Sequence, residues 1–300
     1  MLLQQLINGL TLGSVYALIA LGYTMVYGII ELINFAHGEI YMLGAYMGIV
    51  TFGFLSTLHL ISPDSVAALP LMMVVAMLFC GACGVTMERV AYRPLRGASR
   101  LSPLISALGV SIFLQNFVML AQGPRDKGFP NLLAGGGIDL PGARISAIQI
   151  FIMATSVMMM IGLQLLVHRT KIGKAMRATA QDMQMACMVG INVDRVISVT
   201  FLVGSILAGV AGILVGMYYG LINFFIGYIA GIKAFTAAVL GGIGKIQGAM
   251  LGGLLLGLVE SLGAGYISSE YKDVFAFAIL IVVLIFRPSG LLGEDISKRV

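Results

Sequence analysis

The first lysine or arginine of this 300-residue chain is Arg89, and three long apolar stretches precede it, at 1–30, 40–58 and 65–87. The hydrocarbon core of a bilayer is about 30 Å thick and is crossed by roughly 20 residues of apolar helix. Five more apolar stretches follow, at 101–123, 145–167, 196–232, 246–259 and 274–286. The sequence therefore predicts an all-α polytopic membrane protein with about eight transmembrane helices.

Two of these stretches are longer than one crossing needs. At 1.5 Å per residue the first would measure about 45 Å, so we expect a tilted or broken helix there. The stretch 196–232 contains several glycines and Asn223. We expect it to hold one span and the beginning of the next.

Composition excludes a water-soluble protein. Hydrophobic residues make up 59% of the chain and charged residues 10%, whereas soluble domains carry about 25% charged residues. The net charge of +5 does not indicate nucleic-acid binding, because the basic residues lie in short loops between apolar stretches. No soluble segment is long enough for a second globular domain, so we expect a single transmembrane domain over residues 1–300. The first stretch lacks the basic start of a signal peptide and should be retained.

The basic residues also predict the topology, since cytoplasmic loops are enriched in lysine and arginine. The loops at about 88–103 and 168–195 should be cytoplasmic, and the Gly/Pro-rich loop at about 123–144 should be irregular and lie outside. The C-terminal tail should be inside, and counting back from Arg89 places the N-terminus outside. The basic residues used are Arg89, Arg93, Arg96, Arg100, Arg169, Lys171, Lys174, Arg177, Arg195, Lys298 and Arg299.

Glycines recur at helical spacing along the apolar stretches. Small residues four positions apart let membrane helices approach closely, where no hydrophobic force drives association. We therefore expect tight helix packing at these pairs. They are Gly9/Gly13, Gly44/Gly48, Gly212/Gly216/Gly220, Gly227/Gly231, Gly248/Gly252 and Gly253/Gly257.

Polar residues gather between the first two apolar stretches, where Asn34, His37 and Glu39 follow Glu31. Ionisable groups in or beside a membrane span are candidates for function. One interpretation is a proton relay through Glu31, His37 and Glu39. We favour a polar turn at the membrane surface, in which Asn34 caps the second helix and Glu39 interacts with its dipole.

Three other charged residues interrupt the later apolar stretches. We expect Glu260 to lie either deep in the membrane or at its outer boundary, and Lys233 and Lys245 to extend their amines to the surface. Gly241–Lys245 does not fit a phosphate-binding loop, because Val239 stands where its first glycine belongs and Ile246 follows the lysine. No metal-ligand spacing or nucleophile–base motif appears, so we expect no cofactor and no ATPase site. Cys80 and Cys83 are expected to be small packing residues.

The segment 173–190 predicts a short amphipathic helix in the second cytoplasmic loop. Its apolar stripe comprises Met176, Thr179, Ala180, Met183, Ala186 and Cys187, and Gly190 supplies a stop. By pattern alone, this helix could lie on the lipid surface or dock onto a cytoplasmic protein.

Motifs of one transporter family occur in order along nearly the whole chain. They are Asn8–Ser14, Tyr16–Ala20, Gly22–Gly28, Asn34–Glu39, Glu88–Pro94, Ser111–Asn116, Lys233–Gly244 and Arg287–Gly290. Through these motifs the chain resembles the permease of branched-chain amino acid ABC transporters, of the LivH type. It departs from this family at Lys245-Ile246-Gln247-Gly248, where relatives usually have Ser-Ile-Pro-Gly.

The resemblance implies an inner-membrane permease subunit that imports leucine, isoleucine and valine. It implies four kinds of partner: a second homologous permease subunit, two cytoplasmic ABC ATPases, a periplasmic branched-chain amino acid binding protein and membrane lipid. It also favours docking over lipid binding for 173–190, with the ATPase-coupling contact at Arg177, Ala178, Asp182, Ala186 and Gly190. Two alternatives stay open: an ABC permease for urea or short amides, and an ion-coupled secondary transporter using the polar residues near His37.

Overall fold

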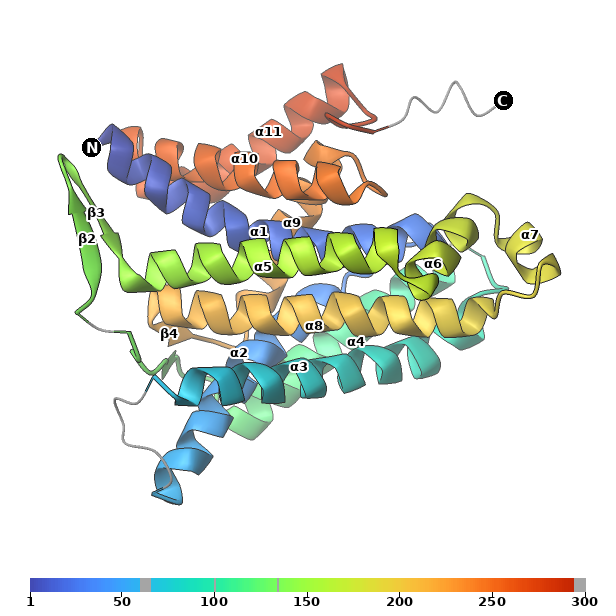
Figure 1. The fold of residues 1–300 in the computed structure, drawn as a ribbon, viewed down its shortest axis with the longest axis horizontal. Helices are drawn as coiled ribbons and strands as arrows, with labels where there is room; N and C mark the ends of the chain where they lie inside the picture. The colour runs from blue at the N-terminus through green and yellow to red at the C-terminus, as the bar shows by residue number, and fades with distance from the viewer. Residues whose placement is uncertain (60–65, 100, 134, 294–300) are drawn as a thin grey trace.

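The computed structural model describes residues 1–59, 66–99, 101–133 and 135–293, and it is built almost entirely of helices (Figure 1). Arg100, Lys298 and Arg299, which the topology prediction used, lie outside the described residues. The helices are α1 (Leu2–Ile30), α2 (His37–Thr57), α3 (Ala68–Met87), α4 (Leu101–Gln122), α5 (Ala147–Arg169), α6 (Lys171–Gln181), α7 (Met183–Met188), α8 (Val193–Tyr219), α9 (Ile226–Gly241), α10 (Ile246–Tyr266) and α11 (Lys272–Phe286).

Within the described residues, seven helices are long and apolar enough to cross a membrane: α1, α2, α3 with its helical extension to Leu95, α4, α5, α8 and α10. Helix α9 is apolar but shorter. The all-α polytopic prediction is confirmed. The stretch 196–232 divides as predicted: α8 ends at Gly220, whose φ of 69° is the left-handed conformation that glycine adopts easily, and α9 begins at Ile226.

Helix α1 is the centre of the bundle. Every residue from Thr11 to Val26 is buried, and α1 packs against α10, α8, α9, α5 and α2. A helix that is apolar on all sides is expected in such a position. Of the tilted or broken helix expected here, the break is excluded, because the helix is continuous over 29 residues. Helix α4, unlike α1, has large apolar side chains exposed on its surface, namely Ile112, Phe113 and Leu120. This exposure suits a helix that faces lipid.

Glycine contacts set the helix spacing, as the sequence predicted. A Cβ atom placed on Gly13 would lie 2.8 Å from the Cα of Leu254 in α10, and one on Gly9 would lie 2.8 Å from the Cα of Leu258. Gly44 of α2 lies equally close to Gly209 of α8. Since Cβ atoms do not approach other backbones so closely, these helices touch only because the side chains are missing.

The segment 123–144 was expected to be irregular, but part of it forms strands. β2 (Gly137–Leu140) and β3 (Ala143–Ser146) make an antiparallel hairpin, and β1 (Lys127–Gly128) pairs with β4 (Leu221–Ile222). Gly142 has a φ of 88° and permits the hairpin turn. Ser146 then begins α5 with a capping box, in which its side chain accepts from the Gln149 backbone while the Gln149 side chain accepts from the Ser146 backbone.

The hairpin marks one end of the bundle, and the N-terminus lies beside it (Figure 1). The backbone N–H of Arg144 donates to the Gln4 side chain at 2.8 Å, and Gln149 donates to Asn8 at 2.8 Å. The opposite end carries α6, α7 and the turn between α9 and α10. These two ends are called the hairpin end and the coupling end below.

Candidate functional site

Helix α2 begins inside the bundle. His37 packs edge-on against Tyr23 with the ring centroids 4.9 Å apart, and its imidazole occupies the space beside Gly22 of α1. Gly22 precedes the end of α1 by about 12 Å of helix at 1.5 Å per residue. Asn34, His37 and Glu39 are at most 2% exposed. The predicted turn exists, but its position at the membrane surface was wrong: the chain folds back into the protein before α2 starts.

Asn34 does not cap α2, so that prediction was also wrong. The residue that precedes the helix is Ala36, and no side chain caps it. The Asn34 side-chain oxygen instead accepts the Tyr92 hydroxyl at 2.7 Å. Since Tyr92 lies in the helical extension of α3, this bond fixes the turn against α3.

His37 and Glu39 are directed to different neighbours, because helical residues two positions apart do not share a face. The Glu39 Oε1 atom accepts the Ser111 hydroxyl of α4 at 3.0 Å. Its Oε2 atom faces Gly227 and has no hydrogen-bond partner among the described residues. Glu31 is exposed and ends α1 in a left-handed conformation, with φ 52°. Hydrogen bonds therefore do not link the side chains of Glu31, His37 and Glu39, among the described residues, into the series that the alternative proton relay would need.

Glu39 lies where two helices begin. Gly38 packs on Gly227 and Gly231 of α9, with the built Cβ of Gly38 2.8 Å from the Gly231 Cα. Gly227 also adjoins Met42, so the first turns of α2 and α9 overlap in antiparallel directions. Helix N-termini carry a partial positive charge. The Glu39 carboxylate is therefore placed near two of them.

A buried ion pair joins α9, α10 and α11. The Lys233 amine lies 2.7 Å from Glu260 and 2.6 Å from Asp273, and Tyr16 of α1 donates to Glu260 at 2.9 Å. The Lys233 and Glu260 side chains are 4% and 2% exposed. The expectation that Lys233 reaches the surface was wrong, and Glu260 is buried inside the protein. Sequence reasoning noted both residues singly. Each is an isolated charged residue in an apolar stretch, and the two charges are opposite. This feature of the sequence could have predicted the ion pair.

The first basic loop is largely helical. A π-helical turn (Glu88–Tyr92) and a 3-10 turn (Arg93–Leu95) extend α3. The Arg96 guanidinium bonds to the fully buried Glu88, and to Asp194 of α8 at 2.6 Å. Ser198 donates to the other Glu88 oxygen at 2.7 Å. The arginines that predict sidedness therefore also attach α3 to α8.

The segment 173–190 forms two helices instead of the single predicted one. Thr170 caps α6, and Asp182 interrupts the segment by accepting the N–H groups of Gln184 and Met185 at 2.8 and 2.9 Å, which starts α7. A side chain that caps one helix ends the previous one. Gly190, with φ 85°, provides the predicted stop.

The predicted apolar stripe of this segment is only partly buried. Met176, Thr179 and Ala186 are buried, whereas Ala180, Met183 and Cys187 are exposed. The Arg177 guanidinium donates to the Val167 carbonyl at the end of α5. Asp182 and Gly190 are exposed and Ala178 is half-buried. The exposed residues form a surface at the coupling end of the bundle.

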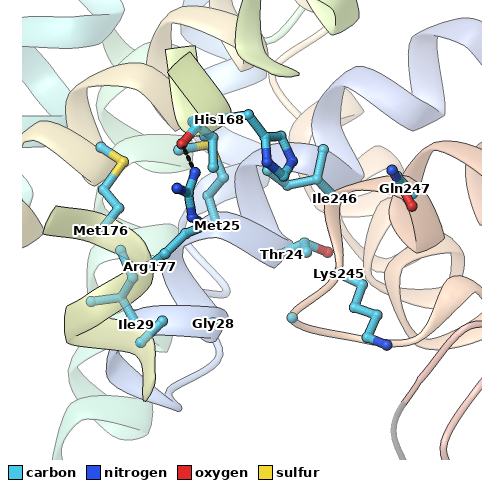
Figure 2. A pocket seen from close by; sticks show the side chains of 13 residues that line it. Thr24, Met25, Gly28, Ile29, His168, Met176, Arg177, Lys245, Ile246 and Gln247 are labelled. Carbon is cyan, nitrogen blue, oxygen red and sulfur yellow. Dashed lines mark hydrogen bonds between the residues drawn. The ribbon is translucent and has the colours of Figure 1, made fainter. Parts of the chain in front are cut away.

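A cavity of about 270 Å³ lies beside this surface (Figure 2). Four parts of the chain line it: the last turns of α1, the end of α5, the face of α6 with Met176 and Arg177, and the turn from Gly244 to Gln247. The predicted coupling residue Arg177 and the departure at Lys245–Gln247 are thereby brought to opposite walls of one cavity, which the sequence did not reveal.

Cys80 is buried, and its sulfur donates to the Ile40 carbonyl at 3.4 Å, so it packs α3 against α2 as expected. Among the described residues, no group of three or more His, Cys, Asp or Glu side chains could hold a metal ion.

Comparison with known proteins identifies the family. Residues 5–284 match the model of the branched-chain amino acid transport system / permease component. The chain is 54% identical to the high-affinity branched-chain amino acid transport system permease protein BraD of Pseudomonas aeruginosa, covering 99% of this chain and 98% of BraD. It is 50% identical to the corresponding permease protein LivH of Escherichia coli K12, covering 99% and 97%.

The chain belongs to this permease family. A more distant relative, the probable LivH permease of Methanocaldococcus jannaschii, is 28% identical over 95% of the chain. The family resemblance inferred from the motifs is confirmed, and the protein is a multi-pass membrane permease and a transport subunit, not an ATPase. A permease of an ABC system works with ATPase and binding-protein partners.

Proposed function

We propose that this permease carries leucine, isoleucine and valine across the bacterial inner membrane as part of an ATP-driven importer. The observation that supports this most is the 54% and 50% identity to BraD and LivH over nearly their whole lengths. The chemistry is consistent with it. An amino acid keeps both charges at neutral pH, and such groups do not enter hydrocarbon unaided.

The assembly that we propose has four kinds of partner. A second homologous permease subunit completes the pathway, two cytoplasmic ABC ATPases supply the energy, and a periplasmic branched-chain amino acid binding protein delivers substrate at the hairpin end. The hairpin end and the N-terminus are then outside, and the coupling end is in the cytoplasm. The arginine and lysine residues of α6 and the α3 extension support this orientation.

We assign ATPase contact to the surface formed by α6 and α7, with Arg177, Ala178, Asp182, Ala186 and Gly190 as its predicted residues. Two features of the segment support this. Its position between α5 and α8 connects it directly to two spans, and α7 exposes Met185 and Met188, which are 59% and 73% exposed. Unbranched, adaptable methionines suit a protein-binding surface.

Photo-crosslinking tests the contact. A photo-reactive residue in place of Met185 or Met188 should form adducts with the ATPase in the assembled transporter. The same residue in place of Asp139, on the exposed hairpin, serves as the matched control and should not. ATPase adducts from Asp139 with none from α7 would contradict the assignment.

We propose a structural role for Asn34, His37 and Glu39 over their alternative as a proton or substrate pathway. Each is buried in the turn that starts α2, and Asn34 and Glu39 bond to other helices. The turn thereby joins α1, α2, α3, α4 and α9 near mid-bundle.

Reconstitution tests the transport proposal. Vesicles holding the complete transporter and its binding protein should accumulate leucine only with ATP inside the compartment that contains the ATPases, and a proton uncoupler should have no effect. Uptake driven by an ion gradient without ATP would establish the secondary-transporter alternative. Competition by urea or acetamide, without competition by isoleucine or valine, would establish the alternative substrate class.

A further inference from the structure

The cavity at the coupling end is lined by both apolar and polar side chains from α1, α5, α6 and the turn before α10 (Figure 2). Met25, Ile29, Val167, Met176 and Ile246 supply apolar surface. Thr24, His168, Arg177, Lys245 and Gln247 supply polar groups. None of the described residues that line it is Asp or Glu. The described lining residues therefore offer hydrogen-bond donors and the positive charge of Arg177.

Arg177 is placed to serve a ligand as well as the fold. Its guanidinium has five N–H donors in a fixed plane, and the bond to the Val167 carbonyl holds that plane at the cavity wall. A guanidinium held in this way suits a phosphate group, which it can contact through two parallel bonds.

Thr24 supplies an independent indication of a ligand. The residue is 1% exposed, lines the cavity, and its hydroxyl has no hydrogen-bond partner within the described part of the chain. Thr11 in the same helix, Thr200 in α8 and Thr236 in α9 each donate to the carbonyl four residues earlier. A buried hydroxyl without a partner costs free energy, and a ligand oxygen in the cavity would remove that cost.

We propose that this cavity binds the headgroup of an anionic phospholipid from the cytoplasmic leaflet. Arg177 and Thr24 would contact the phosphate, and the methionine and isoleucine side chains would contact the start of an acyl chain. The volume of about 270 Å³ is just below the roughly 300 Å³ at which pockets for drug-sized ligands begin, so it takes a headgroup while the acyl chains lie outside. Basic pockets between helices on the cytoplasmic side commonly bind such headgroups.

The lipid would act as a bridge. The cavity lies between α6, which we assign to ATPase contact, the turn between α9 and α10, and the last turns of α1, which α6 also contacts directly. A phospholipid held by Arg177 on one wall and by α1 on another would connect the coupling surface to the central helix.

Lipid titration of the complete transporter tests the proposal. The transporter is stripped of lipid in mild detergent, and phosphatidylglycerol or phosphatidylcholine is added. Bound lipid is counted by native mass spectrometry, and the melting temperature is followed. We expect phosphatidylglycerol to bind and raise the melting temperature and phosphatidylcholine to do neither. Arg177→Gln should weaken phosphatidylglycerol binding by about five- to tenfold, the effect of one charged contact.

Two further variants make the test specific. Thr24→Val keeps the shape of the side chain and removes its hydroxyl, so it should reduce phosphatidylglycerol binding and leave the lipid-free melting temperature the same or higher. Arg89→Gln removes an exposed arginine that does not line the cavity and should bind phosphatidylglycerol normally.

Three results would overturn the proposal. Equal stabilisation by inorganic phosphate would show a site for free anions. Equal loss of lipid binding in Arg89→Gln would show general surface attraction. Crosslinking of a photo-reactive residue at Ala180 to the ATPase, with no lipid retained, would show that a protein segment fills the cavity. Since none of these results involves leucine uptake, failure here is distinct from failure of the proposed transport function.

Discussion

Lys233, Glu260 and Glu88 are charged side chains held inside the helix bundle, and each lies against an opposite charge. Lys233 pairs with Glu260, and Glu88 pairs with Arg96. Burial of an unpaired ion in a low-dielectric interior is very costly. The first pair joins the consecutive helices α9 and α10, whereas Glu88 and Arg96 attach the α3 extension to α8 through Ser198 and Asp194. At the residue scale, buried charge therefore restricts which helices can be neighbours.

The Lys233 pair gives a prediction on stability. Lys233→Met should lower stability by about 3–5 kcal/mol, because Glu260 would keep only the Tyr16 hydroxyl as partner. The double variant Lys233→Met/Glu260→Gln should recover much of that loss. The melting temperature of the purified protein in detergent measures both. A double variant less stable than the single one would show that charge neutralisation is not the reason.

His37 gives a prediction on mechanism. If the imidazole only fills the space between Tyr23 and Gly22, His37→Gln should keep most ATP-driven leucine uptake, because the amide keeps polarity and much of the volume. Glu39→Gln should behave alike, since its amide oxygen can still accept from Ser111. Initial uptake rates in vesicles measure both. Near-complete loss in both variants, with normal protein levels, would restore the proton-relay or pathway interpretation.

At the scale of helices and strands, glycine residues determine how closely two neighbouring helices pack. The α1–α10 contact runs through Gly9, Gly13, Gly253 and Gly257, where each backbone meets the other directly. Other helical glycines face open space, including Gly109 of α4 and Gly162 of α5. The same residue type thus has two roles, and only the neighbouring helix distinguishes them.

A matched pair of alanine substitutions tests this distinction. Gly13→Ala should destabilise the protein and reduce its amount in the membrane, because the new methyl group would lie 2.8 Å from the Leu254 Cα. Gly162→Ala should be neutral or stabilising by up to about 1 kcal/mol, since alanine favours helix more than glycine does. The melting temperature should fall for Gly13→Ala and stay the same or rise for Gly162→Ala. Equal changes in the stability of the two variants would contradict the conclusion that Gly13 is needed for close packing of α1 against α10.

The whole molecule has two different ends. The hairpin, the N-terminus and the pairing of β1 with β4 lie at one end, whereas α6, α7, the cavity and the α3–α8 ion pairs lie at the other. Helix α1 runs between them as the buried centre. An importer needs this asymmetry, because substrate arrives on one side and ATP is hydrolysed on the other.

Cysteine labelling tests the orientation. Cys187 is a natural exposed cysteine in α7, and it should not react with a membrane-impermeant thiol reagent added to intact cells. Cysteine at Asp139, on the exposed hairpin, should react when introduced into a Cys187→Ser background. Permeabilised cells provide the control in which Cys187 becomes reactive. Labelling of Cys187 in intact cells would reverse the proposed topology.

The sequence by itself determined the class of protein and most helix positions, because apolar runs long enough to cross a bilayer have few alternatives. It also determined the family, since its motifs extend over nearly the whole chain. Glycine spacing predicted close packing, although it did not show which helices would meet.

Tertiary structure alone decided where the polar residues lie. Asn34 looked like a helix cap and Lys233 like a surface lysine because local patterns describe only nearby residues. Their actual partners, Tyr92 and Glu260, are 58 and 27 positions away. The cavity likewise combines parts of α1, α5, α6 and α10 that no sequence period connects. Local hydrophobicity fixes helices in a membrane, whereas long-range packing determines which polar groups those helices bring together.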